Sequence, residues 1–419
     1  MRATLPAERA DWSTIEKGLA QMADNDIDWR AGRIAVFVFH PGDDVLDVAK
    51  DAYGMFQSEN GLGAASAFPS LKKMEDDVVD MGLDLLHAPE HACGSITSGG
   101  SESIFLAVKS CRQRARARGV DTRDAEIIMP RSGHPAFDKA AHYLDLKTVR
   151  IPVDADYLAD TTAMHEAITD KTIMIVGSAP CYPYGLIDPI TRLSEVALEY
   201  DLWLHVDACV GGYFAPFARM NGIDLPEFDF RVEGVNSISA DLHKYGYAAK
   251  GASTLFHRHK DQQQYQVFSC SDWACGEMKT PSLAGTRPGG SIASAWAVMN
   301  YLGVKGYCEK VRQVTETRER LCSGIQEIDG LQIYGKPQLG LMIYGSANRN
   351  TQMIWQGMYD RGWFSPPLDE PPSIHLMLSP GHADHVEAYL EDLNDVVAKV
   401  AISTQNGHMH ARYTSPCCL

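Results

Sequence analysis

The stretch "SISADLHKYGYAAKGAS", residues 237–253, places a lysine beside a histidine in a segment made largely of small and apolar residues. Lys244 follows His243 directly, and a strand-like run precedes both. A lysine is rarely buried in a protein unless it has a charged partner or a chemical task. Although a lone lysine after a strand is usually solvated, we expect Lys244 to carry a covalently bound cofactor.

The chain on both sides of this stretch predicts alternating strands and helices. Helical stretches such as 188–201 separate several of the apolar runs. Runs without polar interruption predict a mostly parallel sheet covered by helices on both faces, which is an α/β fold. Ligands bind to such sheets beyond the carboxyl ends of the strands. The predicted strands lie at 125–130, 148–153, 172–180, 202–208, 235–241 and 253–257.

The pattern changes after "GTRPGGS" (285–291), where a long helical region at 292–327 leads to shorter strands and a last helix at 382–401. A chain of 419 residues is too long for one small core, so we expect a large and a small domain. We predict an N-terminal segment that packs on a dimer (1–57), a large cofactor-binding domain (58–290), a small C-terminal α+β domain (291–403) and a mobile tail (404–419).

The composition excludes several function classes. The formal net charge is −16, from 54 acidic against 38 basic residues, which disfavours nucleic acid or an anionic membrane surface as a partner. The sequence contains neither a signal-peptide pattern nor an apolar run long enough to span a membrane. We therefore expect a cytoplasmic protein. The ten cysteines form no CxxC array, so no metal site is predicted.

Three features fall near the predicted strand ends, in addition to Lys244. In "TSGGSES" (97–103), the paired glycines and a serine open a helix whose backbone amides suit a phosphate, although such a pair is commonly just a turn. Asp207 in "HVDACVGG" follows a buried strand and could face a ring nitrogen, or equally could cap a loop. His134 in "RSGHPAF" could stack on an aromatic ring, although loop histidines are more often structural. Together with Lys244, these are the groups that pyridoxal phosphate needs.

The chain resembles the fold-type I pyridoxal-phosphate enzymes of the group II decarboxylase family, and within it most closely the sphingosine-1-phosphate lyases. The resemblance covers roughly residues 68–390, and its specific motifs are the lysine segment and "AGTRPGG". The other matching stretches are "TSGGSES", "HPAFDKAAHYL", "GSAPCYPYGLIDPI", "LHVDACVGGY" and "RGWFSPPLDEPPSIHLMLSPGH".

The resemblance implies a fold with a seven-stranded sheet and a role for each matching residue. Lys244 would form the Schiff base, His134 would stack on the cofactor ring, and Asp207 would pair with the ring nitrogen. Thr286 would reach the cofactor phosphate of the neighbouring subunit, which implies a homodimer with shared active sites. Further cofactor contacts are implied for Gly99, Gly100, Ser101, Ser178 and His243, and substrate contacts for Asn60, Tyr247 and Lys250.

One departure leaves the reaction open. The lyases carry an Asn-Pro-Leu-His-Pro-like stretch before "FPSLKKME", whereas this chain has "ENGLGAASAFPS" (59–70), which contains no histidine and has its proline only at position 69. The first hypothesis is a lyase that cleaves a phosphorylated amino alcohol to an aldehyde and ethanolamine phosphate. The second is an amino-acid decarboxylase, and the third is a non-catalytic binding protein on the same fold.

Overall fold

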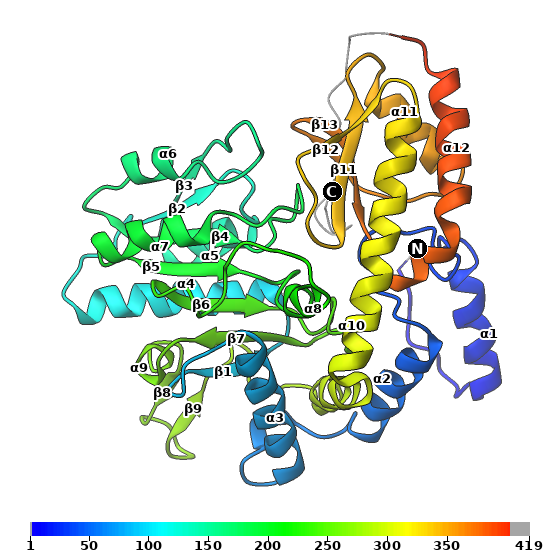
Figure 1. Cartoon of the computed structure of the whole chain (residues 1–419). Helices are drawn as coiled ribbons and strands as arrows, with labels where there is room; N and C mark the ends of the chain where they lie inside the picture. Colours follow the sequence, from blue (N-terminus) through cyan, green and yellow to red (C-terminus); the bar gives the residue numbers. More distant parts are fainter. Residues whose placement is uncertain (1, 403–419) are drawn as a thin grey trace.

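The computed structural model describes residues 2–402, and its centre is a seven-stranded sheet (Figure 1). The strands lie in the order β1-β7-β6-β5-β4-β2-β3. Strand β7 is antiparallel to both of its neighbours, and all the other pairs are parallel. This arrangement confirms the predicted α/β fold class. The strands are β1 (Cys93–Thr97), β2 (Glu126–Pro130), β3 (Lys147–Ile151), β4 (Thr172–Ser178), β5 (Trp203–Asp207), β6 (Val235–Ala240) and β7 (Ser253–His257).

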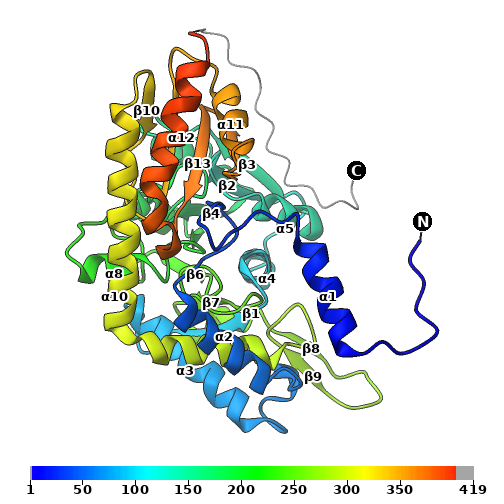
Figure 2. The same ribbon diagram turned by 90° about the vertical axis from the view of Figure 1, so that its right-hand side faces the viewer.

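Helices cover both faces of the sheet, as Figure 2 shows with α4 and α5 on one side and α8 and α10 on the other. Helix α4 (Gly100–Ala117) packs on the strands through Ile104, Val108, Cys111 and Ala115, whose spacing of three and four residues forms one apolar stripe. The other helices of this domain are α3 (Pro69–Leu85), α5 (Ala136–Leu144), α6 (Thr161–Glu166), α7 (Ile190–Glu199), α8 (Ala215–Met220) and α9 (Lys260–Gln263), with a short 3₁₀ turn at Gly61–Gly63.

The C-terminal part is built on a second, four-stranded antiparallel sheet with the order β10-β11-β13-β12. It begins with the long helix α10 (Gly289–Glu327), which bends at Gly303 where φ is 52°. Together with its ψ of −174°, this φ lies in a backbone region that is open essentially to glycine alone, so Gly303 accounts for the bend. The strands are β10 (Leu331–Tyr334), β11 (Leu341–Ser346), β12 (Pro367–Asp369) and β13 (Pro372–Met377), and the helices are α11 (Thr351–Tyr359), a 3₁₀ turn at Pro380–His385, and α12 (Val386–Lys399).

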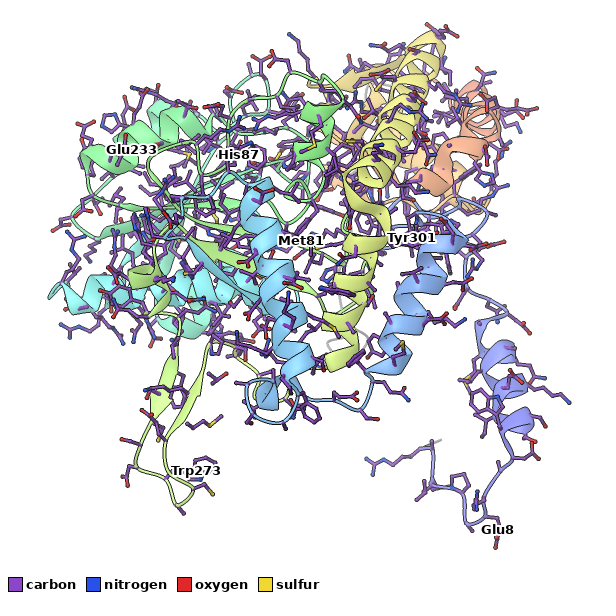
Figure 3. The ribbon with its side chains drawn as sticks, turned by 60° about the horizontal axis from the view of Figure 1, so that its bottom comes forward. Glu8, Met81, His87, Glu233, Trp273 and Tyr301 are labelled. Carbon is purple, nitrogen blue, oxygen red and sulfur yellow. The ribbon has the colours of Figure 1, made fainter. Side chains whose placement is uncertain are left out.

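Two segments project from this body, helix α1 and a hairpin. Helix α1 (Trp12–Ala23) has no buried residue and lies apart from both sheets (Figures 1 and 2). The next helix, α2 (Asp43–Met55), does not project but packs along α10. The hairpin of β8 (Phe268–Cys270) and β9 (Met278–Thr280) extends away from the large sheet with Trp273 near its tip (Figure 3).

The predicted strands and long helices are present with shifts of a few residues at their ends. Strand β1 was not among the predicted runs, because Ile96 is the only strongly apolar residue in "CGSIT". The β8–β9 hairpin was also not predicted. None of the helices within residues 2–402 is long and apolar enough to cross a membrane. The tail predicted at 404–419, and position 403, lie outside the described residues.

Candidate active site

A cavity of about 390 Å³ lies at the carboxyl ends of the central strands, between these ends and the first turn of α4. This is the edge at which a parallel sheet gathers functional side chains. The cavity brings together seven of the predicted site residues, namely Gly99, Gly100, Ser101, His134, Asp207, His243 and Lys244. Other residues that line it include Glu102, Tyr182, Cys209 and Asp241.

Lys244 enters this cavity from the turn that follows β6, and its charge is balanced by a buried carboxylate. The Lys244 Nζ lies 3.0 Å from Asp241 Oδ2. Burial alone would lower the pKa of Lys244, but the carboxylate of Asp241, with smaller contributions from Cys209 and Asp207, raises it above its ordinary value. Lys244 is therefore a protonated ammonium group in this state, and the carboxylate of Asp241 stabilises its charged form.

His134 lies in the loop between β2 and α5, and its ring has a defined protonation state. The backbone N–H of Ala136 donates to His134 Nδ1 at 3.1 Å, so the other ring nitrogen, Nε2, carries the proton of a neutral ring. Burial lowers the pKa of His134 despite the nearby carboxylate of Asp207. A neutral, fixed imidazole is suited to lie against an aromatic ring. Tyr182 packs edge-on to it, with 6.3 Å between the ring centroids.

Asp207 is the last residue of β5 and is held from two sides. Its Oδ1 accepts a hydrogen bond from the backbone N–H of Cys209 at 3.1 Å and one from Ser239 Oγ at 3.4 Å. Both bonds go to the same oxygen atom. The carboxylate is thus oriented at the base of the cavity that Lys244 and His134 also line.

The glycine turn before α4 brings the backbone close to the site. A Cβ atom on Gly100 would lie 2.8 Å from both Cys209 Sγ and Asp241 Oδ2, so no larger side chain fits without displacing them. Glu102 fixes the turn from outside, because its Oε2 accepts from the backbone N–H of Ser98 at 2.7 Å and its Oε1 accepts from that of Leu283 at 2.7 Å. The first N–H groups of α4 are thus available to an anion.

The cavity has the properties that pyridoxal 5'-phosphate requires. Within the described residues, His243 Nδ1 and Asp241 Oδ1 are buried polar atoms without a hydrogen-bond partner, and both belong to residues that line the cavity. Buried polar atoms are rarely left unpaired, so such atoms beside a cavity indicate a polar ligand. An amine, a carboxylate, an imidazole and a helix N-terminus around 390 Å³ match the reactive aldehyde, ring nitrogen, ring face and phosphate of this cofactor.

Five other predicted residues do not line the cavity. Ser178 is buried at the end of β4, in register with Asp207. Tyr247 packs in the core against Tyr307, with a buried hydroxyl group. Asn60 Nδ2 donates to Thr286 Oγ1 at 3.2 Å, so these two residues are hydrogen-bonded to each other outside the cavity.

Lys250, the fifth of these residues, lies beside the cavity wall. Its Nζ donates to the backbone oxygen of Phe37 at 2.8 Å and to that of His243 at 3.3 Å. Desolvation of the ammonium and repulsion from Lys244 lower the pKa of Lys250 to about 8. The ammonium group of Lys250 therefore loses its proton near pH 8. It is hydrogen-bonded to the backbone of His243, the residue that precedes Lys244.

The sequence interpretation missed Asp241 and Glu102 as contributors to the site. Asp241 precedes Lys244 by three residues and directly follows a buried strand, and this is the same signal that singled out Asp207. Glu102 showed no comparable signal, because an acidic residue in the first turn of a helix is common. Only the fold reveals that it joins the glycine turn to residues 281–288.

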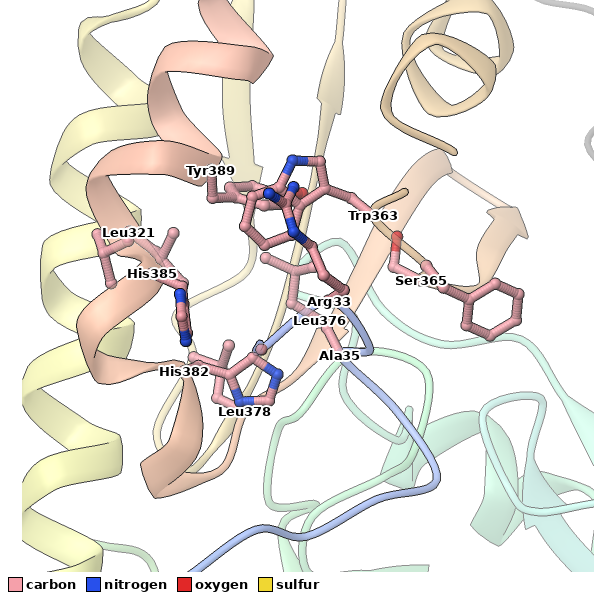
Figure 4. Close-up of a pocket in the computed structure, with 13 residues that line it drawn as sticks. Arg33, Ala35, Leu321, Trp363, Ser365, Leu376, Leu378, His382, His385 and Tyr389 are labelled. Carbon is pink, nitrogen blue, oxygen red and sulfur yellow. The ribbon is translucent and has the colours of Figure 1, made fainter. Parts of the chain in front are cut away.

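The small domain contains a second, much smaller cavity of about 20 Å³, in which Arg33, Trp363, His382 and His385 are among the lining residues (Figure 4). Such a volume has room for about one water molecule. His382 donates from Nε2 to the backbone oxygen of Ile34 at 3.0 Å and accepts at Nδ1 from the backbone N–H of Ser379. His382 therefore joins the N-terminal segment to the small domain.

Comparisons with known proteins bear on the fold and on the cofactor of this chain. Residues 35–345 match the pyridoxal-dependent decarboxylase conserved domain. The chain is 40% identical to sphingosine-1-phosphate lyase of Arabidopsis thaliana, over 94% of this chain and 74% of that protein. It superimposes on the structure of Burkholderia pseudomallei sphingosine-1-phosphate lyase with a TM-score of 0.91 and 34% identity, covering 95% and 93% of the two chains. It is also 33% identical to a probable L-tyrosine/L-aspartate decarboxylase of Methanothermobacter thermautotrophicus, over 81% of this chain and 91% of that protein.

Proposed function

We propose, from the premise that this chain belongs to the pyridoxal-dependent decarboxylase family and to its sphingosine-1-phosphate lyase group, that it cleaves the Cα–Cβ bond of a phosphorylated long-chain amino alcohol. The products are an aldehyde and ethanolamine phosphate. The hydroxyl group next to the broken bond loses its proton, and the former Cα gains one. The chain is thus a pyridoxal-phosphate-dependent lyase.

The residues of the cavity support a role for each part of the cofactor. Lys244 holds it covalently, His134 lies against its ring, Asp207 faces its ring nitrogen, and the first turn of α4 with His243 binds its phosphate, with Ser178 as an additional contact. When bound, pyridoxal phosphate supplies an attachment for the substrate amine and accepts the electrons of the bond broken at Cα. Lys244, once displaced by the substrate amine, is a proton carrier next to the reacting carbon.

The position of Lys250 is the observation that supports a phosphorylated substrate. Its ammonium group donates to the backbone oxygen of His243, one residue before Lys244, in a chain whose net charge is −16. An anionic substrate group can replace backbone carbonyls as a stronger partner for this cation. Lys250 thus binds the substrate phosphate, and Tyr247 and Asn60 are further substrate contacts in this proposal.

A homodimer completes the site in this proposal. Thr286 and Asn60 are paired with each other and do not line the cavity of their own chain, which suits residues that act on the neighbouring subunit. Helix α1 carries an exposed apolar stripe of Trp12, Ile15, Leu19 and Met22 at helical spacing, and such a stripe is a surface that a second subunit can cover.

The alternative, an amino-acid decarboxylase, is favoured by the 59–70 segment, which lacks the histidine of the lyase pattern, and by the similarity to the archaeal decarboxylase. Incubation of the purified protein with a phosphorylated sphingoid base and, separately, with L-tyrosine, L-aspartate and L-glutamate distinguishes the two. We expect aldehyde from the first and no carbon dioxide from the others. Carbon dioxide release without aldehyde would overturn the lyase proposal.

The Lys244→Ala variant is the control for both reactions. We expect it to remain folded and to lose both turnover and the visible absorption of the bound cofactor. A wild-type protein that gains no visible absorption with added pyridoxal phosphate would favour a non-catalytic protein instead.

A further inference from the structure

A line of polar side chains runs along one face of β5 and β6, beneath the cavity. Trp203, His205 and Asp207 alternate along β5 and therefore point to the same face of the sheet. On β6, Ser237 is paired with His205, and Ser239 with Asp207. The side chains of Trp203, His205, Ser237 and Ser239 are fully buried in a layer that α4 and α5 otherwise fill with apolar residues, so each polar group needs a partner there.

These five residues form a continuous series of hydrogen bonds that ends on the carboxylate. Trp203 Nε1 lies 2.8 Å from Ser237 Oγ, and this oxygen lies 2.8 Å from His205 Nδ1. On the other side of the ring, His205 Nε2 lies 3.2 Å from Ser239 Oγ. Ser239 Oγ then lies 3.4 Å from Asp207 Oδ1, which is the longest of the four contacts.

The groups at the two ends of the series determine which atom is the donor in each of its hydrogen bonds. The indole of Trp203 is only a donor, so Ser237 accepts from it and must donate its own proton to His205 Nδ1. Since burial lowers the pKa of His205 to about 4, the ring is neutral at physiological pH and keeps its proton on Nε2. That proton goes to Ser239, whose hydroxyl donates to Asp207. The opposite direction would leave the Ser237 proton without an acceptor.

We propose that His205 is a positioning residue for Asp207, acting through the Ser239 hydroxyl to hold the carboxylate aimed at the ring nitrogen of the cofactor. This inference rests on the proposed role of Asp207. His205 does not line the cavity, so it acts only through Ser239. The backbone N–H of Cys209 also donates to Asp207 Oδ1, and therefore the loss of the series weakens the orientation of the carboxylate without abolishing it.

The test measures cofactor binding to the full-length protein after the cofactor has been removed. We expect Ser239→Ala to raise the dissociation constant of pyridoxal phosphate about tenfold, which is the size of effect expected for one hydrogen bond to a charged group. Ser239→Thr keeps the hydroxyl and should restore most of the affinity. His205→Phe should match Ser239→Ala.

His257→Phe is the matched control for the histidine substitution. His257 is equally buried, its pKa is also lowered to about 4 by burial, and its hydrogen bond runs to Gln266 and not toward Asp207. It should reduce the unfolding temperature of the cofactor-free protein as His205→Phe does, but leave cofactor affinity unchanged. Solid-state ¹⁵N NMR of ring-labelled cofactor should show a less protonated ring nitrogen in Ser239→Ala and His205→Phe only.

Asp207→Ala separates this inference from the proposed function. If it weakens cofactor binding more than tenfold while Ser239→Ala and His205→Phe leave affinity and the ¹⁵N shift unchanged, the positioning role is wrong and the role of Asp207 stands. If Asp207→Ala itself has no effect, the proposed role of Asp207 fails first. Equal losses of affinity in the His205 and His257 variants would also overturn the positioning role, because they would indicate a general packing effect.

Discussion

At the scale of single residues, the proposed role of Lys250 predicts that substrate binding depends on pH. Its pKa is lowered to about 8, first by desolvation and then by repulsion from Lys244, so the side chain is a cation below that pH and becomes neutral above it. We expect the KM for a phosphorylated substrate to rise as the pH increases from 7 to 9, because the neutral amine no longer attracts the phosphate.

The matched comparison is Lys250→Arg, whose guanidinium stays charged over this range and should remove most of the rise in KM. Steady-state kinetics with phosphorylated and unphosphorylated forms of one substrate provide the measurement. A similar rise for both forms would mean that Lys250 does not contact the phosphate.

At the scale of secondary-structure elements, Arg287 connects α3 to the segment that carries Thr286. Its guanidinium makes two hydrogen bonds to Glu75, at 2.5 and 3.0 Å, and one to the backbone oxygen of Gly61, at 3.0 Å. Both side chains are largely buried, so the removal of one partner leaves a buried charge.

We predict that Arg287→Met lowers the free energy of unfolding by about 3 kcal/mol. Adding Glu75→Leu should recover a large part of this loss, because two apolar side chains can replace a buried ion pair. Urea denaturation of the two single variants and the double variant completes the cycle. Independent, additive losses would show that the two charges do not depend on each other.

At the scale of the whole molecule, the exposed stripe of α1 predicts how subunits associate. Its side chains are exposed by 45% at Ile15, 53% at Leu19 and as much as 78% at Met22. If α1 lies in the interface of the proposed dimer, Ile15→Asp with Leu19→Asp should raise its dissociation constant about tenfold or more, because a charge cannot be buried there without a partner.

Ser13→Asp with Gln21→Asp is the control, since it adds the same charge on the opposite face of α1. Analytical ultracentrifugation across a dilution series measures the association. Turnover per chain should fall with the dimer fraction, because Thr286 acts on the neighbouring subunit in this proposal. An unchanged dimer in the stripe variant would assign α1 to another role.

Much of the fold and of the cofactor chemistry could be predicted from local sequence. Apolar runs between helices indicated six of the seven strands of the large sheet, but the antiparallel direction of β7 and the existence of β1 depend on long-range pairing that no short pattern encodes. Lys244, His134 and Asp207 stood out because each is a costly or reactive residue at the end of a predicted strand or in a loop. The structure places these three residues around one cavity, and the roles of all the predicted site residues remain predictions.

The order of residues along the chain by itself determined the alternation of strands and helices and which cofactor the chain can hold, because burial preferences and reactive groups are properties of single residues and their near neighbours. The tertiary structure decided which side chains meet. It paired Lys244 with Asp241, turned Glu102 toward residues 281–288, and aligned β5 with β6 so that His205 connects to Asp207 through Ser239. These contacts depend on strand register and helix placement, which arise only when distant segments pack together.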